Sequence, residues 1–78
     1  MAKKVIVYMA DWCPWCHRAM DFLKENQVPF EARDVETGDY AKECMEKSGQ
    51  AGIPVIDIDG EIIVGFDAKK LKELLKLK

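Results

Sequence analysis

Two cysteines separated by two residues, Cys13 and Cys16, are the side chains in this sequence best suited to chemistry. They follow an unbroken apolar run and open a segment of helical periodicity, so they are expected where a strand meets a helix. If Cys13 is the N-cap of that helix, its sulfur faces unpaired backbone N–H groups, which stabilise a thiolate at the positive end of the helix dipole. Pro14 then occupies the first helical position, where its missing N–H costs nothing. The pattern predicts a reactive Cys13 and a less exposed Cys16, one turn further in.

Two other uses of a Cys-x-x-Cys pair have weaker support. Structural zinc sites prefer four ligands, and the only other cysteine or histidine side chains are Cys44 and His17. Because His17 directly follows Cys16, its ring is expected to point away from the two sulfurs. A purely structural disulfide would close a very small loop and restrain the unfolded chain little. A redox pair in a β-α-β setting is therefore favoured, and no metal site is predicted.

Composition and charge narrow the class of protein. Seventy-eight residues support a single domain, residues 1–78, and 49% apolar with 33% charged residues is typical of a soluble folded chain. The net charge of −2 offers no basic field for nucleic acid. No apolar run approaches the roughly 20 residues that cross a membrane, and the N-terminus does not resemble a signal peptide. Three cysteines with one pair do not resemble a secreted disulfide framework, so we expect a cytoplasmic protein.

The first half of the chain predicts a strand, a helix and a second strand. Residues 5–9 are continuously apolar, which suits a central strand covered on both faces. The helix begins at Pro14 and ends near residues 26–27. A strand over residues 30–35 completes a right-handed crossover with parallel strands, which places the cysteine pair at a sheet edge where ligands bind. The positions of the helix expected to be buried are Cys16, Ala19, Met20 and Leu23.

The second half predicts a helix, a hairpin and a final helix. Cys44 is expected on the apolar face of a helix over residues 40–48, as a small buried side chain rather than a catalytic one. Asp59-Gly60 predicts a type I′ turn between two short strands. Asp67 caps the last helix, and Phe66 is expected to pack onto Leu71 as a hydrophobic staple. The apolar face of the second helix is expected to comprise Tyr40, Ala41, Cys44 and Met45, and that of the last helix Leu71, Leu74 and Leu75.

With the motifs Cys13-Pro14-Trp15-Cys16, Gly52-Ile53-Pro54-Val55 and Gly65-Phe66-Asp67, this order of elements resembles the glutaredoxins of the thioredoxin-fold superfamily over essentially the whole chain. The resemblance implies an α/β thioredoxin fold, with a four-stranded mixed sheet flanked by three helices in the order β-α-β-α-β-β-α. It also implies that Pro54 is cis and faces the dithiol, and that the backbone of Ile53 pairs with the substrate like an added strand. A glutathione-like groove is implied near the turn that contains Phe66.

Two departures from the glutaredoxin pattern bear on the reductant. Ala10 stands where members that use glutathione usually carry a lysine, and Asp11 follows it. Val64-Gly65 replaces the usual Gly-Gly pair. The Gly65-Phe66 pair at this place is similar to that of small redoxins that donate electrons to ribonucleotide reductase. The resemblance implies disulfide-containing proteins as substrates, with ribonucleotide reductase as one candidate. It favours recycling by a thioredoxin-reductase-like flavoprotein, with glutathione as the alternative co-substrate.

The sequence therefore predicts a monomeric thiol–disulfide oxidoreductase without a bound cofactor, in which Cys13 is the exposed nucleophile and Cys16 the resolving thiol. His17 is expected to be exposed and idle. The alternative class is a module that binds a metal or an iron–sulfur cluster between two copies through Cys13, and a disulfide isomerase or oxidase would differ only in redox poise. The residues assigned to substrate binding are Trp12, Pro14, Trp15, Ile53, Pro54, Gly65, Phe66 and Asp67.

Overall fold

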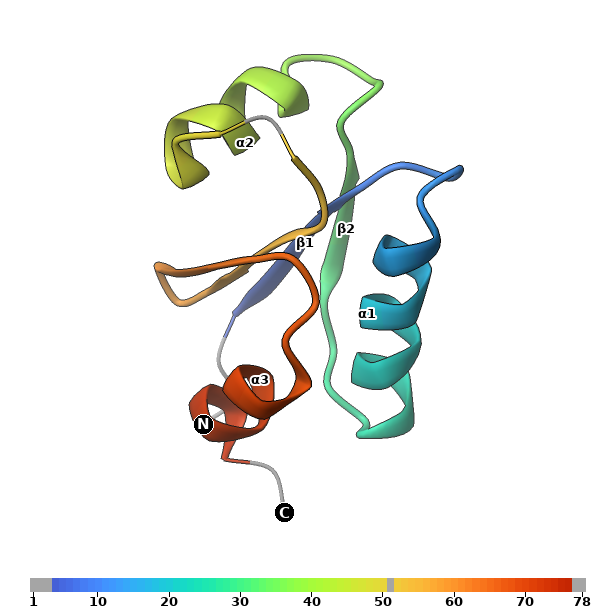
Figure 1. Ribbon diagram of the computed structural model, residues 1–78, viewed down its shortest axis with the longest axis vertical. Coiled ribbons are helices and arrows are strands. Elements are labelled where there is room, and N and C mark those ends of the chain that lie inside the picture. The colour runs from blue at the N-terminus through green and yellow to red at the C-terminus, as the bar shows by residue number, and fades with distance from the viewer. Residues whose placement is uncertain (1–3, 51, 77–78) are drawn as a thin grey trace.

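The computed structural model describes residues 4–50 and 52–76 of the chain, and its helices and strands follow the predicted order. Figure 1 shows α2 and α3 near opposite ends of the long axis, with the sheet between them. The elements are β1 (Val5–Met9), α1 (Pro14–Glu25), β2 (Glu31–Asp34), α2 (Tyr40–Ser48), β3 (Val55–Ile58), β4 (Glu61–Val64) and α3 (Ala68–Leu75).

The sheet has the strand order β2-β1-β3-β4, so β1 lies in its interior. β1 pairs in parallel with β2, as the crossover through α1 requires, and antiparallel with β3. All five residues of β1 are buried, which explains why this strand is continuously apolar. A mixed four-stranded sheet with three helices is the thioredoxin fold, and the predicted fold class is confirmed.

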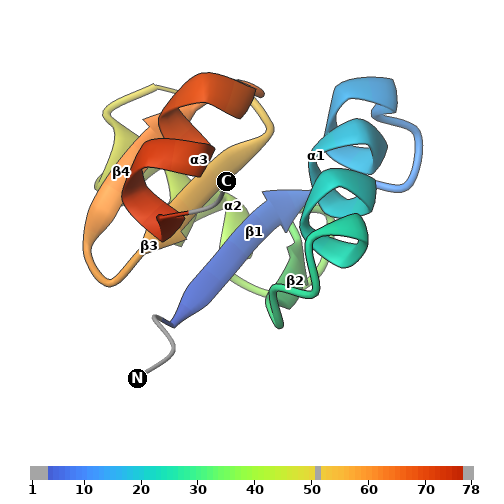
Figure 2. The same cartoon turned by 90° about the horizontal axis from the view of Figure 1, so that it is seen from below.

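The two faces of the sheet carry two apolar clusters. Because strand side chains alternate between faces, Val5, Val7 and Met9 join a cluster with α1 and α3, whereas Ile6 and Tyr8 join a smaller cluster with α2. In Figure 2, α3 lies to the left of β1 and α1 to its right, and α2 lies behind them. The larger cluster therefore connects the cysteine end of α1 to the core. The four α1 residues predicted to be buried are all buried: Cys16, Ala19, Met20 and Leu23.

Local turn signals are matched closely by the structure. Asp59 and Gly60 have φ values of 50° and 94°, the left-handed pair that a type I′ turn between β3 and β4 requires. The Asp67 side chain accepts a hydrogen bond from the backbone N–H of Lys70 and caps α3 as predicted. No helix in the described part of the chain is long and apolar enough to cross a membrane.

The predicted apolar face of α2 is correct for Cys44 and wrong for the rest, because Cys44 is the single residue of this helix that is buried. Ala41 and Met45 are exposed, and Tyr40 is half-buried. Polar contacts attach the helix to the sheet instead: Tyr8 donates to Glu43 at 2.5 Å, and Lys47 Nζ lies 2.7 Å from Asp57 Oδ2. This face of the sheet carries the polar groups of Tyr8 and Asp57 beside its apolar side chains, and Glu43 and Lys47 of the helix bond to them.

Candidate functional site

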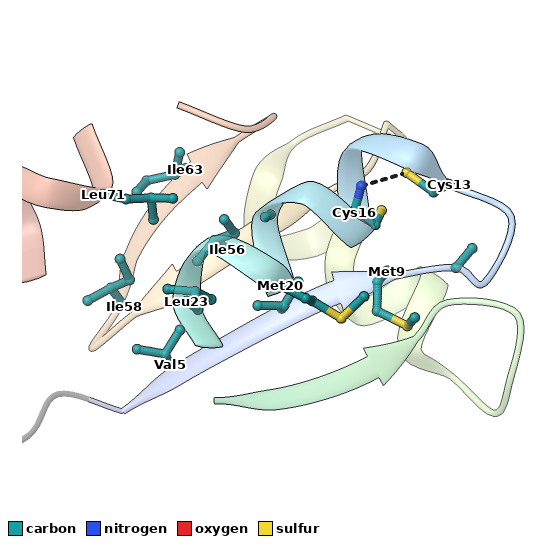
Figure 3. Close-up of a cluster of buried hydrophobic side chains, with 13 residues drawn as sticks. Val5, Met9, Cys13, Cys16, Met20, Leu23, Ile56, Ile58, Ile63 and Leu71 are labelled. Carbon is teal, nitrogen blue, oxygen red and sulfur yellow. Dashed lines mark hydrogen bonds between the residues drawn. The ribbon is translucent and has the colours of Figure 1, made fainter. Parts of the chain in front are cut away.

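Cys13 is the N-cap of α1, as the sequence predicts. A turn delivers it there, since the backbone N–H of Cys13 donates to the carbonyl of Ala10 at 3.1 Å. The cap residue is extended, with φ −89° and ψ 107°, and Pro14 follows at the first helical position. Sγ of Cys13 accepts a hydrogen bond from the backbone N–H of Cys16 at 3.2 Å (Figure 3). Sulfur therefore meets an otherwise unpaired N–H at the positive end of α1.

Both sulfur-bearing side chains belong to the larger apolar cluster, and this corrects one expectation. Cys13 is 5% exposed and Cys16 is fully buried, so Cys13 is not the exposed residue that was predicted, although it is the more accessible of the two. The reason is the cap itself: the Cys13 side chain folds back over the end of α1 to reach the N–H of Cys16.

The environment of Cys16 keeps its thiol protonated. Burial is the largest cause that raises the pKa of Cys16, to about 12, followed by its hydrogen bond to Cys13 and the charge of Cys13. A backbone hydrogen bond at Ala10 acts in the opposite direction and does not cancel these effects. Cys16 can therefore hold its proton beside Cys13 until Cys13 changes its chemical state.

The segment predicted to receive substrate lies against the same cluster. The peptide bond between Ile53 and Pro54 is cis, and the carbonyl of Pro54 accepts a hydrogen bond from the N–H of Gly65 at 2.8 Å. Ile53 is half-buried and packs against both apolar clusters, including the one that contains Cys13. This arrangement joins two motifs that are eleven residues apart in the sequence, the Ile-Pro segment and the glycine turn.

The three residues after β4, Gly65, Phe66 and Asp67, differ in conformation and in burial. Gly65 has a φ of 83°, a left-handed conformation that favours glycine and ends the strand. Phe66 is half-buried, and its ring packs edge-to-face on Phe22 of α1 with centroids 5.7 Å apart. The Phe66 ring therefore packs partly into the core, whereas Asp67 is exposed at the N-cap of α3.

The two tryptophans border the site as expected. Trp12 is 67% exposed and Trp15 is 55% exposed, so both offer aromatic surface next to Cys13. Pro14, between Cys13 and Trp15, is also exposed. Ala10, by contrast, is fully buried in the larger cluster. A lysine side chain at this position would have to displace its neighbours to reach solvent.

Two contacts at this end of α1 were missed by sequence reasoning. His17 is exposed but not idle: its Nε2–H donates to the carbonyl of Asp11 at 2.6 Å and fixes the turn that presents Trp12. The guanidinium of Arg18 lies 4.7 Å from the ring centroid of Trp15. A spacing of three residues on a helix was the signal for this second contact. The described residues include no cluster of three side chains suited to hold a metal ion.

Comparison with known proteins identifies relatives over most of the chain. A family model described as Glutaredoxin matches residues 5–63. A glutaredoxin-like 8.6 kDa protein of the rubredoxin operon of Clostridium pasteurianum is 40% identical over 73 residues, which cover 90% of this chain and 95% of that protein. Glutaredoxin 3 of Escherichia coli K12 is 37% identical over 65 residues, 81% of this chain and 77% of that protein. The crystal structure of a glutaredoxin from Archaeoglobus fulgidus superimposes with a TM-score of 0.86 at 29% identity, over 95% of this chain and 87% of that one.

Proposed function

This chain belongs to the glutaredoxin family of thiol–disulfide oxidoreductases, and we propose that it reduces disulfides of protein substrates in two steps, through Cys13 and then Cys16. The observation that carries this proposal is the 3.2 Å hydrogen bond from the N–H of Cys16 to Sγ of Cys13. It gives one of the two sulfurs a donor that stabilises negative charge, and it leaves the other buried and protonated.

In the first step, the thiolate of Cys13 attacks one sulfur of the substrate disulfide. The substrate S–S bond breaks, a mixed disulfide forms at Cys13, and the leaving sulfur departs as a thiolate that takes up a proton from water. Pro14 and the exposed rings of Trp12 and Trp15 flank the attacking sulfur and contact the substrate. The backbone of Ile53, next to cis Pro54, offers the edge along which an extended substrate segment pairs.

In the second step, Cys16 attacks Sγ of Cys13. Once Cys13 is in a mixed disulfide it carries no charge, so two of the causes that hold the pKa of Cys16 high are removed or weakened. Cys16 loses its proton to solvent, forms the Cys13–Cys16 disulfide and releases the second substrate sulfur. Two electrons and two protons have then passed from the dithiol to the substrate.

The oxidised protein must be reduced again, and we assign this step to a thioredoxin-reductase-like flavoprotein ahead of glutathione. Two exposed tryptophans offer more surface to a protein than to a small charged tripeptide, and the buried Ala10 supplies no cation for a glutathione carboxylate. The turn at Gly65, with Phe66 and Asp67, is the second contact region. We place this exchange in the cytoplasm, carried out by a monomer. No observation of the described residues favours the iron–sulfur alternative.

A single-turnover assay tests the proposal. The fully reduced protein is mixed with a peptide closed by one disulfide, and the masses of both are followed after acid quenching. We expect one equivalent of peptide to be reduced while the protein loses two mass units and gains the Cys13–Cys16 bridge. Protein that stays reduced while the peptide remains oxidised, in a buffer where dithiothreitol reduces the same peptide, would show that the function is a different one.

A further inference from the structure

Arg18 extends a positive charge toward the cysteine end of α1. Its guanidinium lies 4.7 Å from the ring centroid of Trp15, and both side chains are exposed. Residues three apart lie on the same face of a helix, and long helical side chains lean toward the N-terminus. Arg18 is therefore folded back toward the turn that carries Cys13, rather than extended into solvent.

This arrangement leaves the guanidinium able to bind a ligand. Stacking on an aromatic ring uses the flat face of the group, and its N–H donors stay available in the plane. Across residues 4–50 and 52–76, no carboxylate lies within ion-pair distance of Arg18, whereas Arg33 is bonded to Glu31 and Glu43. The ring of Trp15 thus holds Arg18 in place without neutralising its charge.

The chain segment around Cys13 carries no second lysine or arginine. Arg18 is the single lysine or arginine between residues 10 and 18, and the ring of His17 is bonded to the carbonyl of Asp11. Asp11, exposed two residues before Cys13, repels an anionic substrate from its own side. A carboxylate that approaches Cys13 is therefore attracted by Arg18 over Trp15 and repelled on the side of Asp11.

We propose that Arg18, held on Trp15, binds a carboxylate next to the disulfide of the substrate and makes the site select acidic disulfide substrates. The inference rests on the proposed function, since it concerns the substrate of the same cysteine pair. The carboxylate is supplied either by an aspartate or glutamate of a protein or by glutathione, and the chemistry of recognition is the same in both cases.

The test compares matched substrates in single turnovers of the reduced protein. Two cyclic disulfide peptides differ only by Glu or Gln next to one cysteine, and a second pair consists of glutathione disulfide and its ester with blocked glycine carboxylates. We expect the wild type to reduce the acidic member of at least one pair about five-fold faster, the effect of one exposed ion pair. High salt should bring this ratio toward one. A preference in the peptide pair alone assigns the carboxylate to a protein, and one in the glutathione pair alone assigns it to the tripeptide.

Three variants complete the experiment. Arg18→Gln should bring the ratio close to one, and Arg18→Lys should restore part of it. Lys24→Gln removes the same charge from an exposed position of α1, about 9 Å further along the helix, and should keep the wild-type ratio. The inference is overturned if the ratio of acidic to neutral rates is unchanged in Arg18→Gln, or if the wild type shows no preference in either pair. The proposed function stands in both cases. If neither neutral nor acidic substrates are reduced, both are overturned.

Discussion

The backbone N–H of Cys16 points at Sγ of Cys13, 3.2 Å away, so the two cysteines of one motif differ in electrostatic environment. Cys13 receives a donor from the end of α1, whereas Cys16 is fully buried one turn below. This asymmetry divides the exchange reaction between them, and it can be tested one residue at a time.

Cys13→Ser should abolish disulfide reduction, because no other sulfur is placed at the end of α1. Cys16→Ser should still attack but should accumulate a mixed disulfide with the substrate, which intact-mass measurement detects. Cys44→Ala is the matched control: Cys44 is the buried residue of α2, so activity should persist with a stability loss of about 1 kcal/mol. A mixed disulfide that forms at Cys16 in the Cys13→Ser protein would reverse the assignment.

The pH dependence of alkylation tests the environment of Cys16. In a Cys13→Ser/Cys44→Ala protein, Cys16 is the only thiol, and burial, the largest cause of its raised pKa, remains. Its reaction with iodoacetamide should therefore keep accelerating with pH, without a plateau below about pH 10. In denaturant the rate should level off near the ordinary thiol pKa of about 8.5. A plateau near pH 8 in the folded protein would mean that Cys16 is not shielded as the structure indicates.

Lys47 and Asp57 provide a test of how α2 is held. Burial raises the pKa of Asp57, but hydrogen bonds from Lys47 and from the N–H of Gly60 outweigh it and lower the pKa overall. A lowered folded pKa stabilises the protein above the unfolded value, about 4, and this stabilisation is lost as the pH falls through the folded value. Lys47→Ala should therefore cost about 2 kcal/mol at pH 7, and less at pH 3.

Urea unfolding of three proteins measures this effect. Lys42→Ala is the matched control, because Lys42 is exposed on α2 and makes no ion pair within the described residues. It should change the free energy of unfolding by less than about 0.5 kcal/mol at either pH. Equal losses for Lys42→Ala and Lys47→Ala, or a loss that is the same at pH 3 and pH 7, would show that the ion pair does not anchor the helix.

The same helix shows where sequence reasoning ends. α1 and the β3–β4 hairpin were predicted well because their signals are local: a proline after the cap, and Asp59-Gly60 in a turn that needs two positive φ values. The face of α2 depends instead on Tyr8, which lies 35 residues before its partner Glu43. Periodicity alone could not show that Glu43 and Lys47 bond to polar groups of the sheet, so Ala41 and Met45 were assigned wrongly to the core.

At the candidate site, motif spacing identified the cysteine pair but not its surroundings. The N-cap position of Cys13 follows from residue order, whereas its low exposure depends on how the side chain folds onto the helix end. Arg18 and Trp15 are three residues apart, but many helical pairs with this spacing make no contact, so the spacing alone did not predict the stack. The burial of Ala10 could not be predicted without the packed core, because a small residue before a turn can be buried or exposed.

The choice of reductant is the remaining prediction, and it follows from surface and charge. Trp12 and Trp15 are more than half exposed and suit a protein partner, whereas Arg18 offers glutathione one exposed ion pair of about 1 kcal/mol. We expect the oxidised protein to consume NADPH faster with thioredoxin reductase than with glutathione and glutathione reductase. Trp12→Ser should lower kcat/KM several-fold with the flavoprotein and leave the glutathione-dependent rate nearly unchanged. Fast turnover with glutathione and none with thioredoxin reductase would reverse the preference, because the tryptophan surface would then have no part in recycling.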